Sequence, residues 1–314
     1  MIVCLAAQAM GTRFELVLHG GDELFLRAAG EEIIELIGEQ HDRLNAFAPG
    51  SLVSRINALA ADRPVEVDQE LWSLLELCAR VWRQSRGAFD PAVGVLMEQW
   101  GFRSDAAPAS ACRPTRPPGF GAVELDARSR TVRFHERELA LDFGGVAKGF
   151  ALDLAAERLR QVGVECALLH GGTSTSIAIG SAPDGSPWQI RIPSLDSREA
   201  AVRVSLADTS LSVSSPAGRT AERAGQRVGH VMDPILGRPV RVSVAAAVAG
   251  PSAAESDAWS TALVVLGRRV ASMPAGLVSA ILLPGQEWSL EPDGQTVFAC
   301  DADCRHGGCV DEPE

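Results

Sequence analysis

The sequence predicts an α+β fold in which largely antiparallel sheets pack against long helices. Apolar residues recur at helical spacing over several long stretches, with charged residues between them. Elsewhere the chain holds short alternating runs separated by turn residues, which is typical of antiparallel strands. Strands that alternated regularly with helices would instead predict a doubly wound parallel sheet, and this order does not occur.

The first third of the chain supplies a hairpin and a set of helices. Met10-Gly11-Thr12 separates two alternating runs, and polar caps stand before two helical patterns, at Ser51 and Asp68. We expect strands over residues 2–9 and 13–19, and helices over residues 24–44, 51–57, 68–84 and 92–100.

The remaining elements follow the same reasoning. Residues 104–119 are rich in proline, alanine and serine and lack periodicity, so we expect a surface excursion there. We expect strands over residues 122–126, 131–134, 139–143, 167–170, 174–180, 188–193, 202–206, 211–214, 242–248 and 277–283. Helices are expected over 147–162 and 253–266, with a loop over 229–234, a short helix before residue 277 and a final hairpin that ends near Cys300.

Composition limits the possible partners. The 314-residue chain has a formal net charge of −11 with scattered acidic residues, which argues against a sequence-independent hold on nucleic acid. No apolar run approaches the roughly 20 residues that cross a bilayer. Residues 1–9 lack the basic start of an export signal and continue into a strand pattern, so we expect a cytoplasmic protein.

We expect a single domain over residues 1–299 and a polar tail over residues 300–314. The tail contains Cys300, Cys304 and Cys309 beside His306. Their spacing matches none of the common zinc patterns, which favours a plain polar tail over a metal site.

A glycine pair joins the expected strand 139–143 to the expected helix 147–162. Gly144 and Gly145 would let backbone N–H groups and the positive end of a helix approach a phosphate. Lys148 follows in the first helical turn, and it is the only lysine beside 28 arginines. A single lysine in a chain that otherwise uses arginine is a candidate for a role that needs a compact point charge. A simple tight connection between two elements is the alternative explanation.

Asp257 and Thr261 are four residues apart in an expected helix, so their side chains share one face. A carboxylate and a hydroxyl so placed suit Mg²⁺, which prefers hard oxygen ligands and completes its shell with phosphate and water. An ordinary polar pair near a helix start has the same pattern.

Three further side chains are candidates for ligand contact or catalysis. His230 stands in a loop beside Asp233 and could act as a general base, although a lone histidine in a loop is more often a turn residue bonded to backbone. Phe47 and Phe89 lie in polar loops and could stack on an aromatic ring, or fold back into the core. Together these signals indicate one ligand that contains an aromatic ring, a diphosphate and a magnesium ion.

The order of the motifs resembles that of the FAD:protein FMN transferases, the ApbE family. The resemblance covers residues 1–290 and is carried by seven ordered motifs: Met10-Gly11-Thr12, Ser51-x-x-Ser54-Arg55-Ile56-Asn57, Gly87-Ala88-Phe89-Asp90-Pro91 with Trp100-Gly101-Phe102, Asp142-Phe143-Gly144-Gly145-Val146-Ala147-Lys148-Gly149, Gly171-Gly172, His230-x-x-Asp233-Pro234-x-x-Gly237-Arg238-Pro239, and Asp257-x-x-x-Thr261.

The resemblance implies an ApbE-like, T-fold-related fold and a Mg²⁺-dependent reaction. Family members cleave FAD, attach FMN through a phosphoester to a threonine or serine of a target flavoprotein, and release AMP. By resemblance, Asp257, Thr261 and a backbone oxygen near Gly145 hold magnesium, and His230 and Lys148 are catalytic. The positions that hold FAD are Met10, Phe47, Ala88, Phe89, Asp90, Asp142, Lys148, Met232 and Asp233.

Two other functions would need the same FAD-binding site. Water could replace the protein hydroxyl, which makes the chain an FAD pyrophosphatase that yields AMP and free FMN. The chain could also bind FAD without turning it over.

Overall fold

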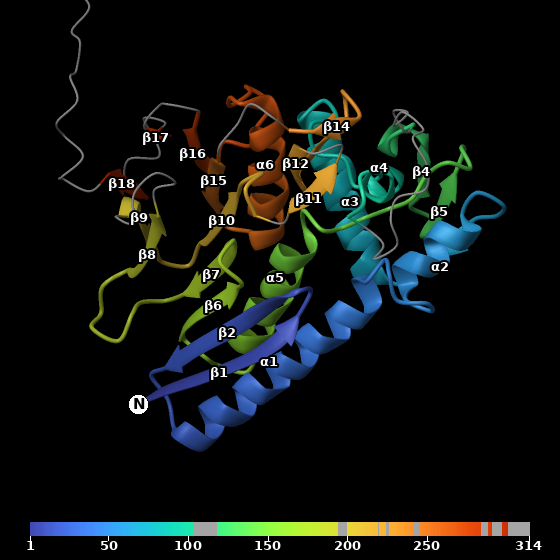
Figure 1. Cartoon of the computed structure of the whole chain (residues 1–314). Coiled ribbons are helices and arrows are strands. Elements are labelled where there is room, and N and C mark those ends of the chain that lie inside the picture. Colours follow the sequence, from blue (N-terminus) through green and yellow to red (C-terminus); the bar gives the residue numbers. More distant parts are fainter. Residues whose placement is uncertain are drawn as a thin grey trace, which may run out of the picture.

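The structure is a computed structural model that describes residues 1–102, 118–193, 200–218, 220–223, 226–240, 245–283, 288–290 and 297–300. Its centre is an eight-stranded sheet in which every neighbouring pair is antiparallel (Figure 1). In sheet order the strands are β1 (Ile2–Ala9), β2 (Thr12–His19), β6 (Cys166–Gly171), β7 (Thr175–Ile179), β10 (Ser210–Ser214), β15 (Ala245–Gly250), β16 (Val278–Leu282) and β17 (Trp288–Leu290). The prediction of an α+β fold with a largely antiparallel sheet is confirmed.

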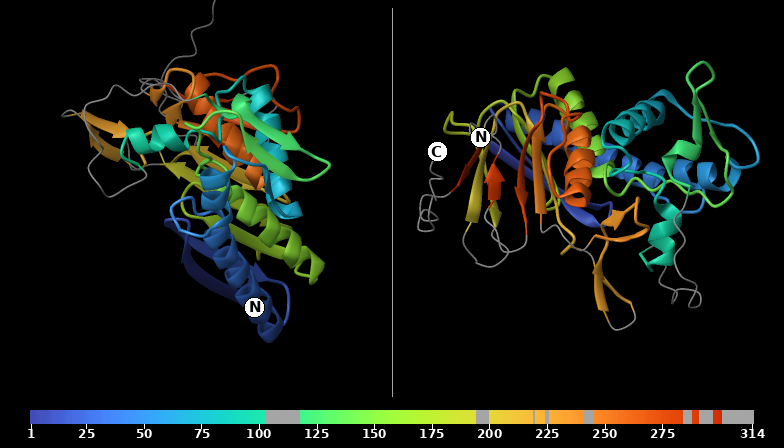
Figure 2. Two further views of the ribbon diagram at one scale, coloured as in Figure 1. Left: turned by 90° about the vertical axis from the view of Figure 1, so that its right-hand side faces the viewer. Right: turned by 90° about the horizontal axis from the view of Figure 1, so that it is seen from above.

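Three helices cover one face of this sheet, and a small sheet covers part of the other (Figure 2). The helices are α1 (Glu23–Leu44), α5 (Ala147–Gln161) and α6 (Ala253–Leu266). Leu16 and Leu18 of β2 pack with Ile33 of α1 and Leu159 of α5 in one buried cluster. The small sheet consists of β8 (Trp188–Pro193), β9 (Ala200–Leu206) and β18 (Phe298–Cys300).

The remaining helices and strands lie outside the eight-stranded sheet and the small sheet, next to α1 and α6 (Figure 1). Two helix caps match their predictions, because the Ser51 hydroxyl accepts from Ser54 N at 3.0 Å and the Asp68 carboxylate accepts from Leu71 N at 2.9 Å. The elements are α2 (Leu52–Leu59), α3 (Gln69–Gln84), α4 (Gly94–Gln99), the 3₁₀ turn η1 (Phe120–Ala122), and the strands β3 (Val65–Glu66), β4 (Val123–Asp126), β5 (Thr131–Phe134), β11 (Thr220–Arg223), β12 (Gln226–Gly229), β13 (Met232–Asp233) and β14 (Arg238–Pro239).

The predicted strand over residues 139–143 is wrong. The segment buries Leu141 and Phe143, but it pairs with no described strand. Its backbone groups form hydrogen bonds outside any sheet. The Asn57 side chain donates to Leu141 O at 3.0 Å and accepts from Leu141 N at 2.7 Å. Asp142 N donates to Pro91 O at 2.7 Å. Burial and satisfied backbone groups therefore hold it without a sheet.

Three further expectations are corrected. The described stretch between Leu266 and Leu277 contains two separate turns and no helix, because Pro274 lacks an N–H and disfavours a helical residue before it. The final strands do not form one hairpin, since β17 pairs with β16 whereas β18 pairs with β9. The expected loop over 229–234 contains β13, which pairs with β14.

The expected excursion over residues 104–119 lies outside the described residues except at its end, and so does the tail beyond Cys300. Residues 242–244 of an expected strand also lie outside them, and β15 begins at Ala245. Within the described ranges, no helix combines the length and the hydropathy that a membrane span requires.

Candidate active site

A turn at the start of α5 places Lys148 against α6. The Asp142 carboxylate accepts from Gly144 N at 2.9 Å and braces the turn. Val146 N and Ala147 N then both donate to Phe143 O, which starts the helix. Lys148 follows in the first helical turn, with only 18% of its side chain exposed. The predicted glycine turn and helix start are therefore present, although the segment that leads into them is not part of a sheet.

Asp257 is the buried anion of the site. It lies on α6 with 2% of its surface exposed. One carboxylate oxygen accepts from the Ser212 hydroxyl at 3.0 Å, and the other accepts from Gly149 N at 3.3 Å and from Lys148 Nζ at 3.4 Å. Burying a charge is costly unless it is paired and hydrogen-bonded, and each Asp257 oxygen has a donor.

Thr261 lies one turn along α6 on the same side, as the spacing predicts. Its hydroxyl donates to Asp257 O at 3.2 Å and lies 3.4 Å from the Ser214 hydroxyl. Gly145 lies opposite, because a Cβ added to Gly145 would be 3.2 Å from Thr261 Oγ1. The structure thus brings Gly145, Lys148, Asp257 and Thr261 into one cluster.

The donor set of this cluster fits a hard cation. Asp257 offers a carboxylate, Thr261 and two serines offer hydroxyls, and the glycine turn has a backbone oxygen, Gly144 O, at 3.4 Å from Lys148 Nζ. Mg²⁺ takes oxygen ligands and usually needs only one or two carboxylates when phosphate and water complete its shell. In the described part of the chain, no group of three or more histidine, cysteine or acidic side chains could hold a metal, so a site rich in protein ligands is not available there.

A row of serines that sequence reasoning missed supports Asp257 from the sheet. Ser210, Ser212 and Ser214 point from β10 toward α6, and their hydroxyls bond Ser256, Asp257 and Ser260 at 3.0, 3.0 and 2.7 Å. The signal was the alternation of serine with apolar residues along 210–214, which places all three hydroxyls on one face of a strand.

Close contact between α5 and α6 sets the geometry of the cluster. At Gly149 the helices approach so closely that an added Cβ would lie 2.2 Å from Ala253 O. Asp153 then accepts from Ser252 Oγ, Ala253 N and Ala254 N at 2.7, 2.7 and 3.0 Å. Burial raises the pKa of the Asp153 carboxyl, and these three hydrogen bonds act in the opposite direction. Asp153 thereby fixes the start of α6, which carries Asp257.

His230 lies beside the chain that continues from β10. A Cβ added to Gly218 would lie 3.2 Å from His230 Cε1, and one added to Gly229 would collide with Pro216 O. The 215–218 segment therefore links the imidazole to Ser214, which contacts Thr261. Sequence reasoning placed His230 near the site, and its ring packs against this segment.

Two of the predicted FAD-binding aspartates brace loops with their carboxylates. Asp90 is 9% exposed and accepts from Ala92 N at 2.7 Å and from Phe120 N at 3.1 Å. Asp233 accepts from the N–H groups of Ile235 and Leu236, both at 2.9 Å, which closes the turn between β13 and β14. Asp90 directly follows the candidates Ala88 and Phe89, and Asp233 directly follows Met232, so the two carboxylates brace the segments next to these residues.

The apolar candidates separate into exposed and buried positions. Phe47 is 51% exposed, whereas Phe89 is 3% exposed in the core and its ring lies next to Gly145. Ala88 and Met232 are also buried. Met10 is half-buried in the turn after β1, and its N–H donates to His41 Nδ1 at 3.1 Å. Of the predicted platforms, only Phe47 presents its ring to the surface.

Comparison with known proteins agrees with this arrangement. Residues 10–276 match the family model of the ApbE family. The chain belongs to the ApbE family. The match begins at Met10, after β1, and spans β2, the Gly144-Gly145 turn, His230 and the Asp257–Thr261 pair, so the whole candidate site lies inside the family region.

Relatives and solved structures of ApbE proteins resemble the chain over most of its length. An FAD:protein FMN transferase from Rhodobacter capsulatus is 35% identical over 265 residues, which cover 82% of this chain and 50% of that protein. One from Treponema pallidum is 31% identical, covering 77% of this chain and 72% of that protein. The crystal structure of the ApbE protein of Thermotoga maritima superposes with a TM-score of 0.86 at 25% identity, covering 95% of this chain and 99% of that one. The ApbE-like fold is confirmed.

Proposed function

We propose that the chain is an FAD:protein FMN transferase. The hydroxyl of a threonine or serine in a target flavoprotein attacks the FMN phosphorus of FAD, the bond to the AMP phosphate breaks, and FMN stays attached through a phosphoester. The relatives carry this name, and family membership supports the proposal. The observation that carries it is the cluster of Lys148, Asp257 and Thr261 beside the Gly144-Gly145 turn, where positive and hard-oxygen groups suited to a diphosphate meet.

The chain's own residues would bind FAD and orient it. The turn at Gly145, with Asp257 and Thr261, would hold Mg²⁺, which when bound neutralises charge on the diphosphate. Lys148 adds a positive charge beside the same carboxylate. The remaining FAD contacts are proposed at Met10, Phe47, Ala88, Phe89, Asp90, Asp142, Met232 and Asp233.

Incubation of the protein with FAD and Mg²⁺ tests the proposed function. A transferase with a target protein present yields AMP and a flavinylated protein. AMP with free FMN in all conditions would instead establish a pyrophosphatase, and intact bound FAD would establish a non-catalytic binder. The cytoplasmic location, the target's identity and the division into residues 1–299 and 300–314 stay predictions.

Replacing Lys148 with Arg is expected to lower kcat/KM for FAD by about 10- to 100-fold. The ammonium fits between Gly144 O and Asp257 Oδ2, each 3.4 Å away, and a wide planar guanidinium does not match a compact, mostly buried position. AMP release at several FAD concentrations measures the effect. The matched control is Arg158→Lys on the same helix, which changes an exposed ion pair with Glu32 and should leave kcat/KM unchanged. Equal kinetics for Lys148→Arg and wild type would contradict the assignment.

His230→Ala is expected to slow transfer by about 10²- to 10⁴-fold while FAD affinity stays near the wild-type value. The reason is that a base close to the acceptor hydroxyl removes its proton as the bond to phosphorus forms, whereas binding depends on other groups. Equilibrium binding of FAD and single-turnover transfer are measured on the same variant. If affinity falls in parallel with rate, His230 braces the Asp233 loop and the general-base role is wrong.

A further inference from the structure

Strand β1 forms one edge of the eight-stranded sheet, and among the described residues only β2 pairs with it. Met10 and Gly11 both have positive φ, 50° and 71°, as a two-residue type I′ hairpin turn requires. The pair Ala9↔Thr12 closes this turn, so alternate residues back along β1 exchange hydrogen bonds with β2. The N–H and C=O groups of the other residues face away from the sheet: Ile2, Cys4, Ala6 and Gln8.

In the described part of the chain, no other strand pairs with the middle of this edge. Among those residues, no hydrogen bond reaches the outward backbone groups of Cys4 and Ala6. The strand sequence, Ile-Val-Cys-Leu-Ala-Ala-Gln-Ala, contains neither a charge nor a proline. Charged side chains and prolines are the usual devices that keep an edge from pairing with another strand. The middle of β1 can therefore pair with an added strand.

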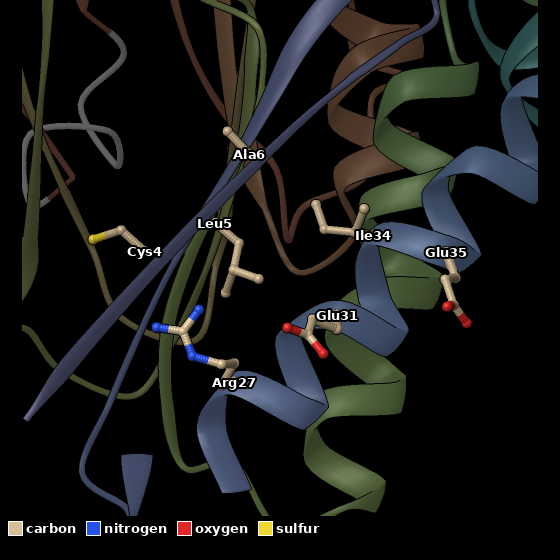
Figure 3. A pocket seen from close by; sticks show the side chains of 7 residues that line it. All are labelled: Cys4, Leu5, Ala6, Arg27, Glu31, Ile34 and Glu35. Atoms are coloured by element: carbon tan, nitrogen blue, oxygen red, sulfur yellow. The ribbon is translucent and has the colours of Figure 1, made fainter. Parts of the chain in front are cut away.

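A groove runs between this edge and α1, with a volume of about 440 Å³ (Figure 3). From β1 it is lined by Cys4, Leu5 and Ala6, and the Cys4 thiol points away from α1, so Cys4 offers its backbone to the groove. Leu5 and Ile34 form an apolar floor. A sheet edge beside a helix is the arrangement that binds extended peptides by strand addition.

The helical wall of the groove is mainly acidic. Glu31 and Glu35 lie one turn apart on the exposed side of α1, and neither forms an ion pair within the described residues. Arg27 lies one turn before Glu31, and its Nη2 atom is 3.9 Å from Glu23 Oε1. Side chains one helical turn apart have Cβ atoms about 6 Å from each other, and alternate side chains on one face of a strand are about 6.6 Å apart. Two basic side chains at alternate positions of an added strand would thus face the two carboxylates.

We propose that the groove between β1 and α1 binds an extended, basic segment of a partner protein, which adds to the sheet at β1 and pairs lysine or arginine side chains with Glu31 and Glu35. A second copy of the chain fits less well, because its own β1 carries no basic side chain and its α1 would bring the same carboxylates into the groove. The proposal concerns a surface outside the FAD site and does not depend on the proposed function.

The test uses the full chain and two blocked heptapeptides, one of alternating valine and lysine and one of alternating valine and glutamate. At low salt the lysine peptide should bind about tenfold more tightly, since two exposed ion pairs are gained in one case and like charges meet in the other. Hydrogen exchange at the amides of Cys4 and Ala6 should slow when it binds. Glu31→Lys with Glu35→Lys should reverse the preference, whereas Glu76→Lys with Glu136→Lys, an equal charge change elsewhere, should not.

A backbone variant separates strand addition from charge attraction alone. Ala6→Pro removes an outward N–H without breaking a bond to β2 and should abolish binding, while Ala6→Thr, which keeps that N–H, should bind normally. Equal affinity for both peptides, or unchanged exchange at Cys4 and Ala6, would overturn the proposal. So would a concentration-dependent dimer that Ala6→Pro abolishes, because the occupant would then be a second copy.

Discussion

Asp257→Asn is expected to lower FAD turnover by about 10³-fold and to leave the fold intact. The amide has the size of the carboxylate and can still accept from Ser212, but it carries no charge to hold a cation at the diphosphate or to pair with Lys148. Because its NH₂ group would face the donors at Gly149 and Lys148, we also expect a loss of about 1–2 kcal/mol in the free energy of unfolding.

AMP release, Mg²⁺ titration and urea unfolding measure these effects on one variant. Ser212→Ala is the matched control, because it removes a hydrogen bond to the same carboxylate and keeps the charge. We expect the control to lose less than tenfold in turnover. Wild-type turnover of Asp257→Asn with the same Mg²⁺ dependence would remove Asp257 from the proposed metal site.

Gly149→Ala is expected to destabilise the protein by about 3 kcal/mol, a large effect for one methyl group. The added Cβ would lie 2.2 Å from Ala253 O and 2.7 Å from Ala254 Cα, and both are backbone atoms of α6. A rotamer change cannot relieve a backbone contact, so the two helices must separate. Turnover should also fall at a temperature where the variant stays folded, because Lys148 and Asp257 meet beside Gly149.

The control for this prediction is Gly38→Ala, which places the same change in another helix. Gly38 lies within α1, and an added Cβ would meet no atom within 4 Å. Alanine has the higher helix propensity, so we expect Gly38→Ala to be neutral or to stabilise by up to about 1 kcal/mol. The midpoints of urea unfolding, measured for both variants and the wild type, give the change in stability. A similar midpoint for Gly149→Ala and wild type would mean that the α5–α6 contact is loose.

Local patterns predicted those parts of the molecule that depend on neighbours in sequence. The caps Ser51 and Asp68 are correct because an N-cap bond joins residues two or three positions apart. The bounds of α6 agree with the prediction of residues 253–266. The four-residue spacing of Asp257 and Thr261 likewise placed both side chains on one side of a helix, where the Thr261 hydroxyl reaches Asp257 O.

Contacts between distant segments decided the rest. Residues 139–143 have a strand-like sequence, yet Asn57 satisfies Leu141, and no local pattern contains that partner 84 positions away. The pairing of β18 with β9 and the role of Asp153 depend on partners about 100 residues away.

The sequence by itself determined the fold class, the bounds of the four long helices α1, α3, α5 and α6 to within one residue, and the candidates Lys148, Asp257 and Thr261. Only the tertiary structure decided that Lys148, Gly149 and Ser212 all converge on one Asp257 carboxylate, and that the aspartates at 90 and 233 brace loops. The physical reason is that a buried carboxylate takes its role from the donors that surround it, and those donors come from α5, β10 and the loops, which meet only when the sheet and helices have packed.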